Sequence, residues 1–216
     1  MITTRTESTV ITLFLFLVCP LSCLIFAWWT PASLSLFGVI PMSENVIISC
    51  ALTGLALGIV VVVATRRQLV SIFYDLNRWI AAVLYLFWSA IALALFMGLP
   101  ICNLVLGGCA GIYVGRKAYH HHISASTFKR VSRHVSLFTA IVVGIISIAM
   151  GILAVHDQTT MQTILGLIGL EWLASTTARK IVLVIIAVPV MTVAQYSMTH
   201  KMAVWVYSSK SSTAIA

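Results

Sequence analysis

Residues 46–64 read VIISCALTGLALGIVVVVA, an apolar run in which no side chain is charged. A run of about 18 or more such residues is long enough to cross a bilayer as an α-helix. Similar runs occupy residues 10–29, 79–97, 135–155 and 181–198, and a shorter one occupies 100–115. Hydrophobic residues make up 61% of the chain and charged residues 8%, whereas a soluble domain is about a quarter charged. The sequence predicts an all-α, polytopic transmembrane bundle of about six spans.

The connections between these runs are short, so a single integral membrane domain over 1–216 is expected. Pro100 suits the first turn of the fourth span, whereas Pro189 should kink the sixth. The segment 159–177 is only moderately apolar, contains Glu171, and leaves little room for a turn before residue 181. It is expected to form an interfacial or re-entrant helix on the outer face.

The distribution of Lys and Arg predicts the orientation of the bundle, because short cytoplasmic loops collect these residues. If the N-terminus is inside, only Arg179 and Lys180 of the thirteen cations lie outside. The others are Arg5, Arg66, Arg67, Arg78, Arg116, Lys117, Lys129, Arg130, Arg133, Lys201 and Lys210. We therefore expect both termini in the cytoplasm (N-in, C-in). The charge bias and the loop lengths suit a prokaryotic cytoplasmic (inner) membrane.

The stretch 98–122, GLPICNLVLGGCAGIYVGRKAYHHH, is rich in glycine. It is not a phosphate-binding loop, because Ala118 stands where that motif needs a hydroxyl. Small or polar residues instead recur every four positions and line one face of a helix, where another backbone can approach closely. These are Asn103, Gly107, Gly111 and Gly115, and Gly54 with Gly58 forms a shorter copy. Helix packing is the predicted role, although Asn103 could also bind a substrate.

The segment 116–134 is basic and contains no acidic residue. A juxtamembrane segment of this kind attracts anionic lipid headgroups. The residues expected to bind lipid, or alternatively an anionic substrate, are Arg116, Lys117, Lys129, Arg130 and Arg133, and Glu171 is a further substrate-binding candidate.

Two groups of side chains are candidate metal ligands. His120, His121 and His122 are consecutive, so they would need an irregular loop to face one ion. Cys19 and Cys23 share a helix face around Pro20, and soft thiol ligands suit copper or zinc. Cysteine is also an ordinary small buried residue, so packing is the competing interpretation. The sequence identifies no cofactor.

Three classes of function fit this pattern. A small-solute transporter, or the membrane subunit of a transport system, agrees with short loops and a proline-broken span. A non-catalytic assembly or scaffold subunit agrees with the glycine ridges, which are the helix faces lined by these glycines, and with a lack of polar groups inside the spans. A membrane enzyme is disfavoured, because no nucleophile and base fall in a recognisable arrangement. The expected partners are the bilayer, a second copy of the chain or another membrane protein, and no nucleic acid is expected.

Overall fold

A computed structural model of the chain describes residues 5–95, 101–156, 166 and 176–213. These residues hold helices and connecting turns, with no β-strand among them. The helices are α1 (Arg5–Leu36), α2 (Glu44–Ile72), the short 3-10 helix η1 (Phe73–Asp75), α3 (Arg78–Leu95), α4 (Ile101–His120), α5 (Ala125–His156) and α7 (Thr177–Thr213). The predicted all-helical fold is confirmed for this part of the chain.

Five helical segments are long and apolar enough to cross a membrane, namely Glu7–Leu36, Glu44–Asp75, Arg78–Leu95, Ala125–Leu153 and Thr177–Ser209. They coincide with five of the predicted spans and support an integral membrane protein. Residues 101–115 of the other predicted span, 100–115, belong to α4, which is not one of these five, and residue 100 lies outside the described residues. Six spans and the N-in, C-in topology therefore stay predictions. The segment 159–177 lies outside the described residues, apart from Gly166, Thr176 and Thr177.

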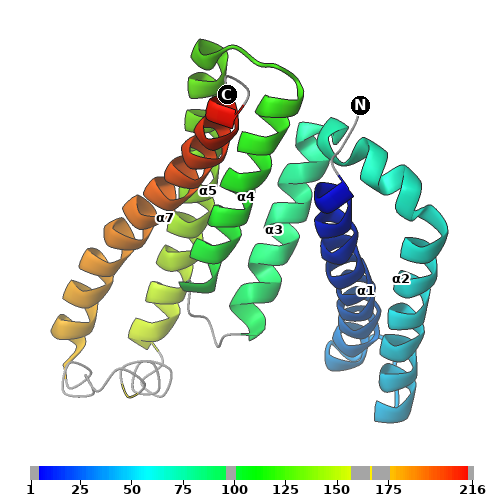
Figure 1. Cartoon of the computed structure of the whole chain (residues 1–216). Helices are drawn as coiled ribbons and strands as arrows, with labels where there is room; N and C mark the ends of the chain where they lie inside the picture. Colours follow the sequence, from blue (N-terminus) through cyan, green and yellow to red (C-terminus); the bar gives the residue numbers. More distant parts are fainter. Residues whose placement is uncertain (1–4, 96–100, 157–165, 167–175, 214–216) are drawn as a thin grey trace. The chain divides into compact units, whose positions relative to one another are not determined.

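The chain divides into two compact units, 1–75 and 76–216. Whether they form the single membrane domain expected from the sequence stays a prediction. Unit 1 is a hairpin of α1 and α2 (Figure 1, blue and cyan). Its turn begins where the N–H of Phe37 donates to the Ser33 carbonyl (2.9 Å) and Gly38 adopts a left-handed φ of +69°. That conformation suits glycine and ends the helix.

Small residues let the two helices of unit 1 approach closely. A side chain added at Gly54 would meet Ala27 and the Cys23 carbonyl, at 2.5 and 2.6 Å, and one at Gly58 would meet the Pro20 backbone at 2.5 Å. The far end of the hairpin is held by polar and aromatic contacts. The Tyr74 hydroxyl donates to the buried Glu7 carboxylate (2.8 Å), and the rings of Phe14 and Phe73 meet edge to face.

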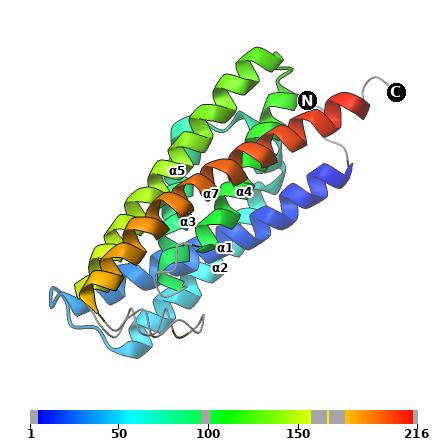
Figure 2. The same cartoon turned by 90° about the vertical axis from the view of Figure 1, so that its left-hand side faces the viewer.

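Unit 2 contains α3, α4, α5 and α7, and α4 contacts each of the other three (Figure 2). Successive contacts show that α4 and α7 run parallel, since Gly107 lies against Gln195 whereas Gly115 lies against Ala203 and Val206. Most of the described side chains of α4 are therefore buried or half-buried. A helix covered by other helices presents less surface to lipid than one at the edge of a bundle.

A small apolar core closes one end of unit 2. It consists of Val114 and Ala118 of α4, Phe128 of α5 and Ala203 of α7. The ring of Phe128 stacks on Tyr207 at 4.1 Å, and the Tyr207 hydroxyl donates to the Ile123 carbonyl (2.8 Å). These contacts attach the turn between α4 and α5 to the last turns of α7.

Large apolar side chains are exposed along the helices of both units. Leu13 is 73% exposed, Val60 62%, Ile145 63% and Ile185 65%. Soluble proteins rarely expose contiguous apolar surface on this scale. The exposed faces are those expected of helices in contact with lipid chains.

Candidate functional site

The interior of unit 2 contains a group of uncharged polar side chains from all four helices. This polar cluster consists of Tyr85 and Ser89 of α3, Asn103 of α4, Ser136 and Thr139 of α5, and Gln195 and Thr199 of α7. All of them except Tyr85 are at most 1% exposed. Side chains of this kind in a membrane bundle need hydrogen-bond partners within the protein, because lipid offers them none.

Hydrogen bonds connect part of the polar cluster between helices. The Gln195 amide nitrogen donates to the Tyr85 hydroxyl at 3.0 Å, which joins α7 to α3. The hydroxyls of Thr139 and Thr199 share a hydrogen bond at 3.0 Å, which joins α5 to α7. Nearer the apolar core, Ser132 of α5 and His200 Nδ1 are 3.1 Å apart. A line of polar contacts thus follows α7 from Gln195 to His200.

Other atoms of the polar cluster are buried without a hydrogen-bond partner among the described residues. They are both amide atoms of Asn103, the Oε1 of Gln195, and the hydroxyls of Ser89 and Ser136. Leaving such a group unpaired costs about 1–3 kcal/mol. Apolar residues of similar size would avoid this cost. The site therefore retains hydrogen-bond donors and acceptors that have no partner among the described residues.

Asn103 and the glycines of α4 form one face, and this face lies against α7. A side chain added at Gly107 would collide with Gln195, one at Gly111 with the Thr199 carbonyl, and one at Gly115 with the Ala203 carbonyl. The same register places Asn103, one turn before Gly107, level with residues 191–195 of α7. Asn103 therefore lies within about one helical turn of the level of Gln195.

Sequence reasoning identified Asn103 but missed the members of the polar cluster on α3, α5 and α7. Single hydroxyls and one amide are easily overlooked within long apolar runs. Their spacing carried a signal, since Ser132, Ser136 and Thr139 recur every three or four residues, as do Gln195 and Thr199. Such spacing places each set on one helix face. Only the packing of the helices shows that these faces meet.

The remaining predicted packing residues, Gly54 and Gly58, contact α1 of the same chain. Cys19 and Cys23 lie near this contact, because their carbonyl oxygens are among the atoms nearest to the two glycines. Both thiols are free and partly exposed. The assignment of these residues to packing or to metal binding stays a prediction.

The basic segment 116–134 is divided between α4, a turn and α5. Lys117 of α4 is half-buried, and its Nζ donates to the Leu76 carbonyl at 2.8 Å and lies 5.9 Å from the Tyr113 ring centroid. Arg116 beside it is also half-buried, whereas Lys129, Arg130 and Arg133 are exposed on α5. The exposed cations have the accessibility that lipid binding needs, and that role stays a prediction.

The histidines lie where α4 ends. His120 is its last residue, His121 and His122 form the turn, and His122 adopts a left-handed φ of 49°. Within the described ranges, no group of three or more His, Cys, Asp or Glu side chains could hold a metal ion. Glu171, the predicted acidic candidate, lies outside those ranges.

The length and composition of the helices, with a buried polar cluster in unit 2, define the class of this chain as an all-helical integral membrane protein. No protein family matches the chain, and neither a characterised protein nor a solved structure shows significant similarity to it. The function must therefore be inferred from the chemistry of the site.

Proposed function

We propose that the protein transports a small, uncharged, hydrogen-bonding solute across the membrane, alone or as the membrane subunit of a transport system. The polar cluster of unit 2 would be its binding site. The observation that carries this proposal is the set of unpartnered buried groups at Asn103 and Gln195. A solute with hydroxyl or amide groups would satisfy them during passage.

The chemistry of the polar cluster favours an uncharged solute. Its members supply amide and hydroxyl groups and no formal charge. A charged solute would lose its hydration without gaining an opposite charge, at a large cost in free energy. Amides and hydroxyls both donate and accept hydrogen bonds, as do alcohols, amides and ureas.

The close packing around the polar cluster corresponds to a closed conformation. Gly107 allows Gln195 to approach α4 so closely that a single added carbon would collide with it. Passage would require α7 to move away from α4. Pro189, inside α7, lies six residues before Gln195, and a proline in a helix removes a backbone hydrogen bond and favours a hinge. We infer that α7 is the moving element.

We propose that α4 also crosses the membrane, which gives six spans in all, and that both termini are cytoplasmic. The buried face of α4 supports this, because polar and glycine residues can lie at membrane depth when other helices cover them. The excess of cations in the predicted inner loops supports the orientation. With short loops throughout, a prokaryotic inner membrane is the proposed location.

The alternative function, a non-catalytic assembly subunit, receives less support. It rested on the glycine ridges as contact surfaces for another protein and on a lack of polar groups inside the spans, whereas most of the polar cluster lies inside them. Gly54 and Gly58 contact α1, and Gly107, Gly111 and Gly115 contact α7, so each ridge is covered by a helix of the same chain. A partner would have to bind elsewhere on the exposed apolar faces.

The test is solute flux in liposomes that contain the purified full chain. Stopped-flow light scattering after an osmotic step would measure the permeability to glycerol and to urea. We expect at least one of them to enter faster than into protein-free liposomes. Asn103→Leu should slow entry by about fivefold to tenfold, the equivalent of one lost hydrogen bond. It should leave thermal stability unchanged or raised, because it removes unpaired polar groups.

Asn45→Leu is the matched control, because Asn45 is exposed in the first turn of α2 and should affect neither flux nor stability. If Asn103→Leu lowered stability and left flux unchanged, Asn103 would serve only to join helices. If neither solute entered faster than into protein-free liposomes, native mass spectrometry would test the alternative function, a non-catalytic assembly subunit. An oligomer or a retained protein partner there would favour the assembly subunit.

A further inference from the structure

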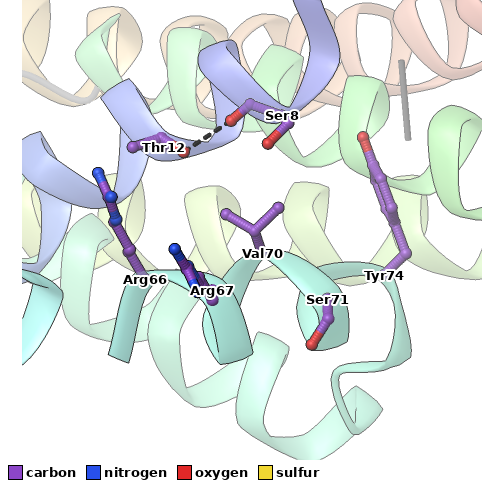
Figure 3. A pocket seen from close by; sticks show the side chains of 7 residues that line it. All are labelled: Ser8, Thr12, Arg66, Arg67, Val70, Ser71 and Tyr74. Atoms are coloured by element: carbon purple, nitrogen blue, oxygen red, sulfur yellow. Dashed lines mark hydrogen bonds between the residues drawn. The ribbon is translucent and has the colours of Figure 1, made fainter. Parts of the chain in front are cut away.

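Unit 1 contains a cavity of about 430 Å³ between the beginning of α1 and the end of α2. Ser8 and Thr12 line it from α1, and Arg66, Arg67 and Val70 line it from α2, with Tyr74 of η1 at its edge. Figure 3 shows both arginine side chains extending from α2 toward α1. From these residues we infer that the cavity binds a phosphate group, and that the headgroup of an anionic phospholipid supplies it.

The hydrogen bonds around the cavity leave the guanidinium groups as its main donors. The Thr12 hydroxyl donates to the Ser8 carbonyl (2.7 Å), and the Tyr74 hydroxyl donates to Glu7 (2.8 Å). Neither Arg66 nor Arg67 has an ion pair or hydrogen bond with any residue in the described ranges. Guanidinium groups bind phosphate oxygens through paired N–H donors, so two adjacent ones form a strong phosphate site.

The acidic side chains nearby do not cancel this charge. Glu7 is buried, and its carboxylate accepts a hydrogen bond from the Tyr74 hydroxyl. Asp75, the residue after Tyr74, is exposed. Neither carboxylate lines the cavity, whereas both arginines do. The cavity walls therefore carry two positive charges and no negative one.

The position of the cavity favours a lipid over free phosphate. Arg66 and Arg67 follow the apolar run 46–64 after one residue, Thr65, at the level where a spanning helix meets the headgroups. On α2, the exposed apolar residues Val63, Val60 and Ile59 lie on the helix face of the two arginines and continue it along the predicted span. A phospholipid could place its phosphate between the arginines and its acyl chains along this face.

The experiment is a lipid titration of the delipidated full chain, followed by native mass spectrometry. Phosphatidylglycerol is the anionic lipid and phosphatidylcholine the zwitterionic comparison. We expect the first phosphatidylglycerol to bind more tightly than phosphatidylcholine. The double variant Arg66→Gln, Arg67→Gln should weaken its binding by about 30-fold, the effect of two cations near a headgroup.

Arg78→Gln with Lys201→Gln is the matched control. It removes two exposed cations, one from α3 and one from α7, outside the cavity and outside the predicted lipid-binding segment 116–134, and it changes the net charge equally. The expected loss there is less than threefold, and thermal unfolding should show both double variants folded. An Arg66→Lys, Arg67→Lys variant, which keeps the charge without the paired donors, should bind with intermediate affinity.

Two results would overturn the inference. Equal losses in the two charge-removing variants would mean that phosphatidylglycerol senses the overall surface charge alone. Displacement of the lipid by millimolar inorganic phosphate, with equal binding of phosphate itself, would mean that the site takes free phosphate and that no lipid headgroup is specifically held. Persistence of tight phosphatidylglycerol binding in excess inorganic phosphate is the supporting result.

Discussion

The contact between α4 and α7 makes Gly111→Ala a sharp test of the structure. A Cβ at residue 111 would collide with the Thr199 carbonyl and lie 3.1 Å from the Ala203 nitrogen. Both are backbone atoms, so rotating a side chain cannot relieve the collision and α7 must shift. Forcing extra volume into a packed interface costs about 1–3 kcal/mol.

Gly108 supplies a control in the same helix. A Cβ there would have a flexible side-chain atom, Met198 Cε, as its nearest neighbour, at 3.4 Å. Both substitutions gain the same helix propensity, about 1 kcal/mol for alanine over glycine. That gain cancels in the comparison, so Gly111→Ala should be less stable than Gly108→Ala by about 1–3 kcal/mol.

The assay is unfolding by sodium dodecyl sulfate in mixed micelles, followed by circular dichroism. Gly108→Ala should unfold at the wild-type midpoint or above it, and Gly111→Ala below it. Gly111→Leu should be less stable still. If Gly111→Ala and Gly108→Ala unfolded at the same midpoint, the close approach of α4 to α7 would be wrong, and with it the register that places Asn103 within about one turn of Gln195.

Two further measurements test other parts of the structure. Tyr74→Phe removes the hydroxyl that donates to the buried Glu7 carboxylate, and it should lower the unfolding free energy by about 1–3 kcal/mol. Tyr119→Phe is the comparison in unit 2. An equal loss of unfolding free energy there would contradict a specific role for the Tyr74 hydroxyl. In a variant without native cysteines, a thiol reagent that does not cross membranes should label Ser43→Cys from outside and not Ser126→Cys, and the reverse pattern would refute the N-in, C-in topology.

Apolar runs predicted the positions of the helices well but not their lengths. The run 46–64 became α2 over Glu44–Ile72, and the run 135–155 became α5 over Ala125–His156. Hydropathy shows which residues suit lipid, whereas backbone hydrogen bonds continue a helix into the polar interface. The segments after Ala64 and before Val135 stay helical for this reason. They contain Arg66 and Arg67 in α2, and Lys129, Arg130 and Arg133 in α5.

The candidate sites were only partly predictable from the sequence. Asn103 could be identified because it shares a four-residue spacing with Gly107, Gly111 and Gly115. The partners of Asn103 in the polar cluster depend on which helices pack together, and a helix period does not specify the neighbour. The positive charges of Arg66 and Arg67 helped to predict the orientation of the bundle. The cavity that they line depends on the packing of the end of α2 against the beginning of α1, which the sequence does not specify.

The pairing of α4 with α7 also affects the order of events during synthesis. More than 55 residues separate the end of α4 from the beginning of α7, since they are His120 and Thr177. The glycine face of α4 therefore leaves the ribosome well before the helix that covers it. Until α7 arrives, this face presents Asn103 and bare backbone, for which lipid is a poor solvent. We expect nascent chains that stop before residue 177 to leave α4 near the insertion machinery, and synthesis of α7 to complete its release into the bilayer.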